Sequence, residues 1–242
     1  MRLIINLGIY EIPRFMMMHM ELYHLLNHSI MGQNLFQKEI DYVRFVHNLY
    51  SFNDTRAADT NTGYFFKSRD LRNPYMERER ELLVDIHAWC LMKDHYHLLL
   101  SERAEGGITT FIRKLNVGYA NYVNEKYARS GTLFRGRTKK VLIERDAQYN
   151  YILYYAHLNP LDYLKGFEKW RVRDGMRIAD AKAALRHLDT YRWSSHLDYM
   201  GEKNFPSLLA DVPAFSTRDY AKNLQVYLSN AGSPAEVAFW LE

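Results

Sequence analysis

The chain has 242 residues, of which 48% are hydrophobic and 25% charged, a composition that excludes a disordered or fibrous protein. Its single cysteine, Cys90, cannot form an internal disulfide, so we expect the reducing cytoplasm rather than a secreted scaffold. No apolar run approaches the roughly 20 residues of a membrane-spanning helix, and residues 1–20 lack the features of a signal peptide. We therefore predict no membrane partner, and an N-terminal extension over residues 1–20.

Positive charge is concentrated in one stretch. The whole chain has a formal net charge of +4, yet the stretch from Arg103 to Arg145 holds ten Lys or Arg against three Glu. Such a stretch can bind a polyanion, because phosphate contacts release condensed counterions. A solvated basic face explains the charge equally well, so charge alone leaves both interpretations open.

The chain up to residue 92 predicts a strand, a helix and a second strand. Residues 22–30 are rich in apolar residues and predict the first strand, and an apolar stripe predicts a helix over residues 38–50. Residues 53–80 are polar and weakly patterned, which indicates a surface insertion. Residues 82–92 predict the second strand, with strict alternation that places Ala88 and Cys90 on the face of Val84 and Ile86, opposite Trp89.

A hairpin and two further helices follow. Lys93 and Asp94 form a turn into a third strand over residues 95–101. Gly106 and Gly107 open a helix that ends near Tyr127. A fourth strand spans about Thr138 to Glu144, and Asp146 suits the N-cap of a helix that Pro160 ends.

This order of elements predicts an α+β fold. The sequence β-α-β-β-α-β is the ferredoxin-like plan, an antiparallel sheet with helices on one face and the other face free for a ligand. We expect one domain over residues 21–166, including the helix after the fourth strand. Helices near residues 178–188 and 217–228 predict a small helical C-terminal appendage over residues 167–242.

Two short patterns carry candidate chemistry. His95 and His97 are two apart on a predicted strand, so they share a face and could bind one metal ion. In YILYYAHLNP, Tyr155 and Asn159 lie one helical turn apart. Each pattern alone is weak, because polar residues are common on the wetter face of a strand and tyrosines commonly pack against sheets. Their combination, with a basic strand between them, is more specific.

Four motifs in this order, HYHLLL, SGTLFRGRTKKVLI, YYAHLNP and YRWSSHLDYMG, resemble the single-tyrosine HUH transposases, also called insertion-sequence 200-like transposases. The resemblance is strongest to the REP-associated tyrosine transposases and spans about Leu22 to Gly201. It implies that Tyr155 is the catalytic nucleophile, and that His95, His97 and Asn159 hold a divalent metal, Mg²⁺ or Mn²⁺.

We also predict a DNA-binding surface. The resemblance implies Arg135, Arg137, Lys139 and Lys140, which match the basic segment of the family. Phe134 adds an aromatic ring for base stacking, and Arg113 and Lys114 are further candidates. The implied partner is single-stranded or hairpin DNA, and family members occur both as homodimers and as monomers. The chain departs from the family at Lys93-Asp94, where Pro-Asn is usual, at Arg135, usually Gln, and at Thr138, usually aromatic. No departure removes an implied catalytic residue.

The implied activity is DNA transposition. Attack by Tyr155 on a phosphodiester would give a covalent 5′-phosphotyrosine and a free 3′ hydroxyl, which allows later joining to another strand. One alternative is a domesticated repeat-DNA or RNA hairpin-binding protein without cleavage. A second is a zinc hydrolase that uses His87 or Asp85 as a further ligand.

Overall fold

The computed structural model describes residues 21–57, 79–144, 146–167, 170, 180–210 and 217–229. Its strands are β1 (Leu22–His28), β2 (Val84–Leu91), β3 (His95–Glu102) and β4 (Lys139–Leu142). Its α-helices are α2 (Glu39–Ser51), α4 (Gly107–Lys126), α5 (Asp146–Leu158), α6 (Ala181–Thr190), α7 (His196–Tyr199) and α8 (Tyr220–Ser229). Short 3-10 helices cover Ile30–Gly32, Asn159–Tyr163 and Pro206–Leu208.

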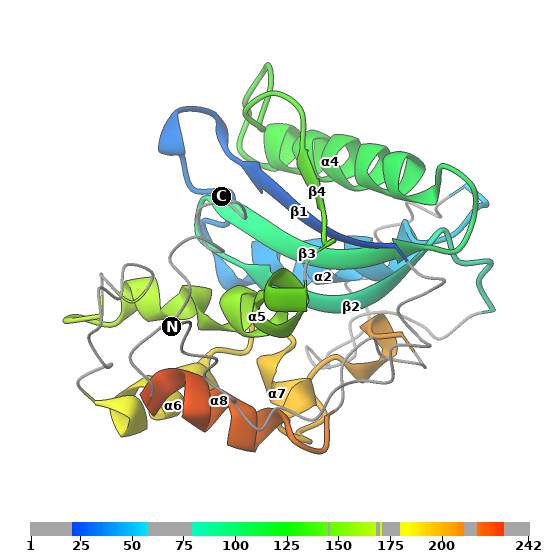
Figure 1. Ribbon diagram of the computed structural model, residues 1–242. Coiled ribbons are helices and arrows are strands. Elements are labelled where there is room, and N and C mark those ends of the chain that lie inside the picture. The colour runs from blue at the N-terminus through cyan, green and yellow to red at the C-terminus, as the bar shows by residue number, and fades with distance from the viewer. Residues whose placement is uncertain are drawn as a thin grey trace.

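The strands form one antiparallel sheet in the order β2-β3-β1-β4. Helix α2 connects β1 to β2, and α4 connects β3 to β4, so each connection passes over one intervening strand (Figure 1). The predicted α+β, ferredoxin-like sheet is therefore confirmed, as are the helix after the fourth strand and the small C-terminal helices.

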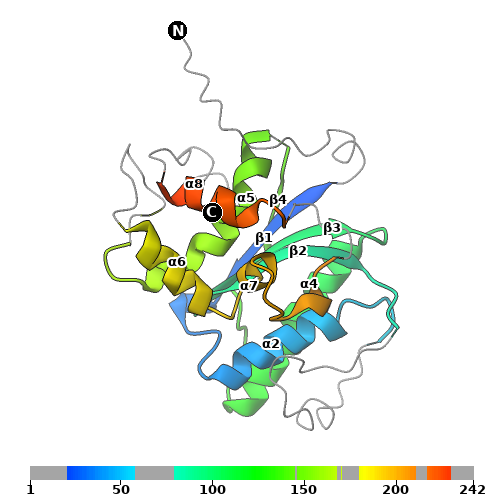
Figure 2. The ribbon, with the colours of Figure 1, turned by 90° about the horizontal axis from the view of Figure 1, so that it is seen from below.

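The two faces of the sheet are covered by different helices. Helices α2 and α4 lie on one face, and α5 lies on the other with α6 and α8 outside it (Figure 2). Leu25 and Leu98 belong to the first core cluster, whereas Leu99 belongs to a second cluster with Ile152 of α5 and Leu224 of α8. The expectation that the second face is free is thus wrong where α5 covers it.

Strict alternation fails in the middle of β2. The register shifts between Ile86 and Ala88, a β-bulge that adds one residue to the strand. As a result Trp89 joins the first core cluster with Ile86, and Ala88 joins the second. The predicted pairing of Ala88 with Val84 and Ile86 on one face is therefore wrong, because a single extra residue reverses the alternation beyond it.

Strand β1 ends before its predicted bound, whereas α5 ends where Pro160 predicts. Strand β1 stops at His28, and the chain then turns through Met31 and Gly32, whose φ angles are 56° and 65°. Helix α5 ends at Leu158, and Pro160 sits in the following 3-10 helix. Proline has no backbone N–H and fits the first turn of a helix better than its interior, so the α-helix stops before it.

The opening of α4 requires glycine. A Cβ atom at Gly107 would collide with the carbonyl oxygen of Leu83, and Gly106 has a φ of 67°. The predicted start of this helix at the glycine pair is therefore confirmed, and it holds α4 close to the start of β2.

The described residues cover only part of the predicted domain scheme. Residues 1–20 lie outside them, as do residues 58–78 of the predicted surface insertion. At the start of that insertion Asn53 is buried, and its side chain bonds the backbone of Leu83 and Val84, so this end belongs to the packed fold. The division into a domain over 21–166 and an appendage over 167–242 stays a prediction. Among the described residues, no helix is both long and apolar enough to cross a membrane.

The Trp-Ser-Ser motif covers the exposed edge of β2. The backbone nitrogen of Leu91 donates to the oxygen of Trp193 at 2.8 Å, and the nitrogen of Ser195 donates to the oxygen of Trp89 at 3.0 Å. The hydroxyl of Ser195 also accepts from the nitrogen of Trp89 at 3.0 Å. An uncovered edge strand offers unpaired backbone groups to other chains, so this segment protects the sheet.

Candidate active site

Pairing of β1 with β3 brings four histidines onto the sheet face that α5 covers. His28 lies opposite His95, and His97 lies opposite Leu26, while His24 is two residues before Leu26 on β1. Because alternate strand residues share a face, the side chains of these histidines all point to the α5 side. We call His24, His28, His95 and His97 the histidine row.

Neighbouring rings of the histidine row contact one another in the spatial order His24, His97, His95, His28. His24 and His97 stack with ring centroids 5.2 Å apart, and the His24 Nε2 and His97 Nδ1 atoms are 3.0 Å apart. The centroids of His97 and His95 are 5.0 Å apart, and those of His95 and His28 are 4.6 Å apart. His24 and His97 are buried, whereas the row becomes accessible at His95 and His28.

Helix α5 places Tyr155 against the buried end of the row. The Tyr155 ring meets His97 edge-on at 5.7 Å between centroids and His24 edge-on at 6.0 Å. The rings of Tyr151, which precedes it on α5, and Trp170 also pack against Tyr155. Tyr155 has no exposed surface. The structure thus brings together His97 and Tyr155, which are 58 residues apart in the sequence.

The neighbouring tyrosine points elsewhere. Tyr154 stacks on Tyr220 at 5.6 Å and lies 4.3 Å from the ring of Tyr227, both on α8. Successive residues differ by about 100° around a helix, so only one of the two tyrosines can face the sheet. That residue is Tyr155.

Asn159 follows Tyr155 by one turn and is fully buried. Its side-chain nitrogen donates to the backbone oxygens of Tyr155 at 2.8 Å and Ala156 at 3.3 Å. These bonds close the last turn of α5 and fix the orientation of the amide.

A buried polar network holds α5 in place. His157 on α5 contacts the hydroxyl of Ser195 through Nε2 at 2.7 Å and the hydroxyl of Tyr220 through Nδ1 at 2.8 Å. Beyond the helix, the hydroxyl of Tyr163 accepts a hydrogen bond from the backbone nitrogen of Lys93 at 2.6 Å. The first set ties α5 to the edge of β2, and the second ties it to the turn before His95. These bonds therefore fix α5, and with it Tyr155, relative to the histidine row.

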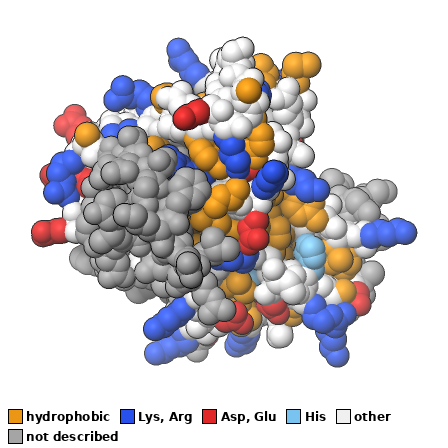
Figure 3. Space-filling view, turned by 180° about the vertical axis from the view of Figure 1, so that it is seen from behind, with side chains coloured by type: hydrophobic (Ala, Val, Ile, Leu, Met, Phe, Trp, Pro, Cys, Tyr) orange, Lys and Arg blue, Asp and Glu red, His pale blue; other side chains and the backbone are white. Residues whose placement is uncertain are grey.

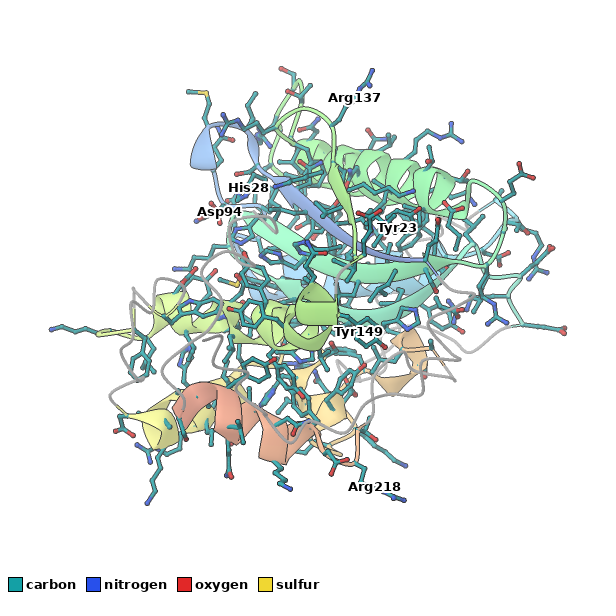
Figure 4. The ribbon with its side chains drawn as sticks, in the orientation of Figure 1. Tyr23, His28, Asp94, Arg137, Tyr149 and Arg218 are labelled. Carbon is teal, nitrogen blue, oxygen red and sulfur yellow. The ribbon has the colours of Figure 1, made fainter. Side chains whose placement is uncertain are left out.

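The predicted basic residues lie on β4 and the loop before it. Lys140 lies opposite Leu25 and so points to the other face of the sheet, where its ammonium group lies over the Tyr23 ring at 3.9 Å. Arg135, Arg137, Lys139 and Lys140 are all exposed, and Figure 4 shows Arg137 projecting from the loop. Lys139 of β4 lies opposite Leu26 of β1, and Leu26 lies opposite His97 of β3. Lys139 and His97 therefore point to the same face of the sheet. They are two strand spacings, about 10 Å, apart. Among the described residues visible from behind, Lys and Arg are spread over the surface (Figure 3).

The other predicted DNA-binding residues have different surroundings. Arg113 is exposed on α4, but the ammonium group of Lys114 donates to the backbone oxygens of Asp54 and Arg56 at 2.5 Å and 2.8 Å. Phe134 is half-buried and meets the ring of Tyr96 edge-on at 6.0 Å. These contacts give Lys114 and Phe134 a structural role in the protein itself.

Sequence reasoning missed His24 and His28. Both stand in the pattern LYHLLNH, four residues apart, and so on one face of the first predicted strand. Recognising them required knowing that this strand pairs with the strand of His95 and His97, which no local pattern shows. The two alternative zinc ligands, His87 and Asp85, are not near His97, and Asp85 lies opposite Ser101. His87 contacts the hydroxyl of Ser101 at 2.8 Å, and Ser101 lies four residues, roughly 13 Å, along β3 from His97.

Several buried histidines predict loss of stability in acid. Burial lowers the pKa of His87 to about 4 and holds the pKa of His157 well below its usual value. A histidine that stays neutral in the folded state takes up its proton on unfolding, so stability is complete above about pH 6.5 and falls as the pH drops below it. For His87 the loss continues to about pH 4.

We expect His87→Gln to reduce the pH slope of the unfolding free energy between pH 6 and 4.5 by up to about 1.4 kcal/mol per pH unit. Urea unfolding at several pH values measures this, and an unchanged slope would contradict it.

The fold and the site define a class of protein, a ferredoxin-like sheet with a tyrosine-bearing helix packed over a histidine pair. Residues 67–139 match the family model described as "Transposase IS200 like". The matched residues include His95, His97 and the basic loop, and end before Tyr155. The resemblance to the insertion-sequence 200-like transposases is thereby confirmed.

The chain was also compared with solved structures and with curated proteins. The chain is similar to a REP-associated tyrosine transposase solved bound to a REP hairpin, with 12% identity and a TM-score of 0.46 over 81% of this chain and 90% of that one. No curated protein matches the chain.

Proposed function

We propose that this protein cleaves and rejoins single-stranded DNA at hairpin or palindromic repeat ends, with Tyr155 as the nucleophile. The observation that carries the proposal is the edge-on contact of Tyr155 with His97, within one chain, beside a strand of exposed basic residues. The match of residues 67–139 to the transposase family model supports the same assignment.

The chemistry follows from the residues at the site. The phenolic oxygen of Tyr155 would attack the scissile phosphorus, the bond to the 3′ oxygen would break, and the DNA would remain linked through its 5′ phosphate to the tyrosine. A 3′ hydroxyl from another strand would reverse the reaction and join the two strands. Tyrosine has an ordinary pKa near 10, so little phenolate forms at neutral pH without help from the site.

We propose that the histidine pair holds a divalent metal ion. His95 and His97 share a face with ring centroids 5.0 Å apart, and Asn159 offers an amide oxygen near the end of α5. Because His24 contacts Nδ1 of His97, Nε2 would be the atom of His97 that binds the ion. A bound Mg²⁺ or Mn²⁺ would polarise the scissile phosphate, and two nitrogen ligands favour Mn²⁺.

Access to the site comes from one side. Tyr155 and His97 are buried, at 0% and 2% exposure, whereas the side chain of His95 is 13% exposed. A phosphate would therefore enter past His95, on the side where the backbone of Arg135 bonds that of His28. Arg135, Arg137 and Lys139 would hold the flanking backbone by charge.

The test is cleavage of a single-stranded hairpin oligonucleotide by the purified protein. We expect cleavage in the presence of Mn²⁺, none after chelation, and none of a fully paired duplex of the same sequence. The same hairpin with its single-stranded flanks removed serves as the control substrate. Binding of hairpins without cleavage under any of Mn²⁺, Mg²⁺ or Zn²⁺ would contradict the proposal.

The complete burial of Tyr155 favours one alternative, a hairpin-binding protein without cleavage. In that case the histidine row and α5 would serve only to stabilise the sheet. The two functions give opposite outcomes in the cleavage assay, while both predict hairpin binding.

Binding through the basic strand predicts a salt dependence. Each phosphate contact to single-stranded DNA contributes about 0.7 to the slope of log affinity against log salt concentration. The double variant Arg137→Ala, Lys139→Ala should therefore bind more weakly at low salt, with a slope reduced by up to about 1.4. Lys182→Ala, Arg186→Ala, which removes two exposed charges from α6, is the matched control and should keep the original slope. Equal slopes for the two double variants would contradict a role for the β4 residues.

A further inference from the structure

Three potential metal ligands meet at the accessible end of the histidine row. His28 on β1 and His95 on β3 are cross-strand partners, and Asp94 immediately precedes His95 in the turn from β2. One ligand atom from each residue lies within 4.8 Å of the others. Figure 4 shows His28 and Asp94 next to each other at one end of the sheet. We call His28, Asp94 and His95 the turn cluster.

The three side chains of the turn cluster already lie close together before any ion binds. Nδ1 of His95 lies 2.8 Å from a carboxylate oxygen of Asp94, and the rings of His28 and His95 are 4.6 Å apart. His28 is exposed, and Asp94 and His95 are half-buried, so an ion can reach all three from solvent.

The backbone around the cluster is held by the fold. The nitrogen of Ser29 donates to the oxygen of Asp94 at 2.7 Å, and the nitrogen of Met92 donates to the oxygen of His95 at 2.8 Å. The nitrogen of Arg135 donates to the oxygen of His28 at 2.7 Å. These bonds join β1, the β2–β3 turn and the loop before β4, so little further ordering is needed for the three side chains to bind an ion.

We propose that the turn cluster binds a zinc-class divalent transition metal ion. Two imidazoles and one carboxylate are a known ligand type for zinc, with a fourth position left to water or another oxygen. Calcium and magnesium prefer oxygen ligands throughout, so they fit this cluster poorly. The ligand set differs from His95, His97 and Asn159 of the proposed function, and shares only His95 with it.

His95 belongs both to the turn cluster and to the metal site of the proposed function, and one consequence therefore rests on that function. An ion in the turn cluster engages His95, so His95 cannot at the same time be positioned for a metal held with His97. Zinc in the cluster would then oppose Mn²⁺-dependent cleavage. The site itself does not depend on cleavage, because metal binding is measured without DNA.

The experiment isolates the cluster by removing His97. Zinc affinity of the metal-stripped full chain is measured at pH 7.5 by competition with a chromophoric chelator. His97→Asn removes the other histidine pair and leaves all three ligands of the cluster, so zinc affinity should stay within about threefold of the original. In the His97→Asn background, His28→Asn or Asp94→Asn should each lower the affinity at least about tenfold, which is about 1.4 kcal/mol.

The controls distinguish zinc bound at the turn cluster from zinc bound at another histidine and from loss of folding. His47→Asn, a half-buried histidine on α2, should leave zinc affinity unchanged. Melting temperatures show which variants are folded, and Asp94→Asn, a change in a partly exposed turn, keeps the test valid if a histidine variant is unstable. Loss of zinc binding in folded His97→Asn, or full affinity in both the His28→Asn and Asp94→Asn double variants, overturns the proposal. Failure of DNA cleavage with intact zinc binding would overturn the proposed function alone.

Discussion

Replacing Tyr155 by phenylalanine is expected to abolish DNA cleavage, on the order of 10³-fold or more, and to leave hairpin binding intact. The change removes only the hydroxyl group. The ring contacts of Tyr155 with His97 and His24 do not need it, so the packing of α5 on the sheet should survive. Cleavage rate and hairpin affinity, measured on the same preparation, test both parts of this expectation.

Tyr154→Phe is the matched control. The Tyr154 ring packs against Tyr220 and Tyr227, away from the histidine row, so cleavage should be retained. An active Tyr155→Phe variant beside an inactive Tyr154→Phe variant would mean that the catalytic residue does not face the sheet.

Loss of His97 is expected to have an effect of similar size. His97→Ala should abolish metal-dependent cleavage and weaken Mn²⁺ binding, because it removes one of the two nitrogen ligands of the proposed site. Tyr155→Phe, in contrast, should lose cleavage and keep Mn²⁺ affinity. Asn159→Ala should weaken Mn²⁺ binding without removing it, because water can replace an amide oxygen.

Stability has to be measured beside activity for this variant. His97 is buried and contacts His24 at 3.0 Å, so its removal leaves a buried polar partner and costs about 1–3 kcal/mol. A purely structural histidine would lower activity only in proportion to the folded fraction. Full Mn²⁺ binding by a well-folded His95→Ala, His97→Ala double variant would contradict the proposed metal site.

Much of the fold was predictable from local pattern. The glycine pair before α4, the turn at Lys93-Asp94 and the stop near Pro160 are signals that act within a few residues, and the structure follows each of them closely. The sheet order then follows from the sequence of strands and helices, since β-α-β-β-α-β has few compact arrangements. These features could be predicted because each depends on short-range steric rules.

The errors arose where distant segments decide the structure. Alternation in β2 broke at the bulge near His87, whose side chain contacts Ser101 on the partner strand. The second sheet face was expected to be open, but the network of His157 and Ser195 holds α5 over it. Neither contact has a signal in the local sequence.

The site was predictable in part for the same reason. His95 and His97 form a visible pair on one strand, and the motif around Asn159 and Pro160 marked Tyr155. The roles of His24 and His28 depend on the register of β1 against β3, which sets His28 opposite His95. Lys114 is among the predicted DNA-binding residues, yet its ammonium group is bonded to the backbone of Asp54 and Arg56, which are distant in the sequence.

The most direct test of the central claim is to trap the protein–DNA intermediate and locate its covalent bond. A single-stranded hairpin substrate is incubated with the protein and Mn²⁺, the reaction is quenched in denaturant, and the adduct is digested and sequenced by mass spectrometry. We predict a nucleotide attached through its 5′ phosphate to Tyr155 and to no other tyrosine. Cleavage without any covalent adduct, or an adduct on a different residue, would contradict the assignment of Tyr155 as the nucleophile.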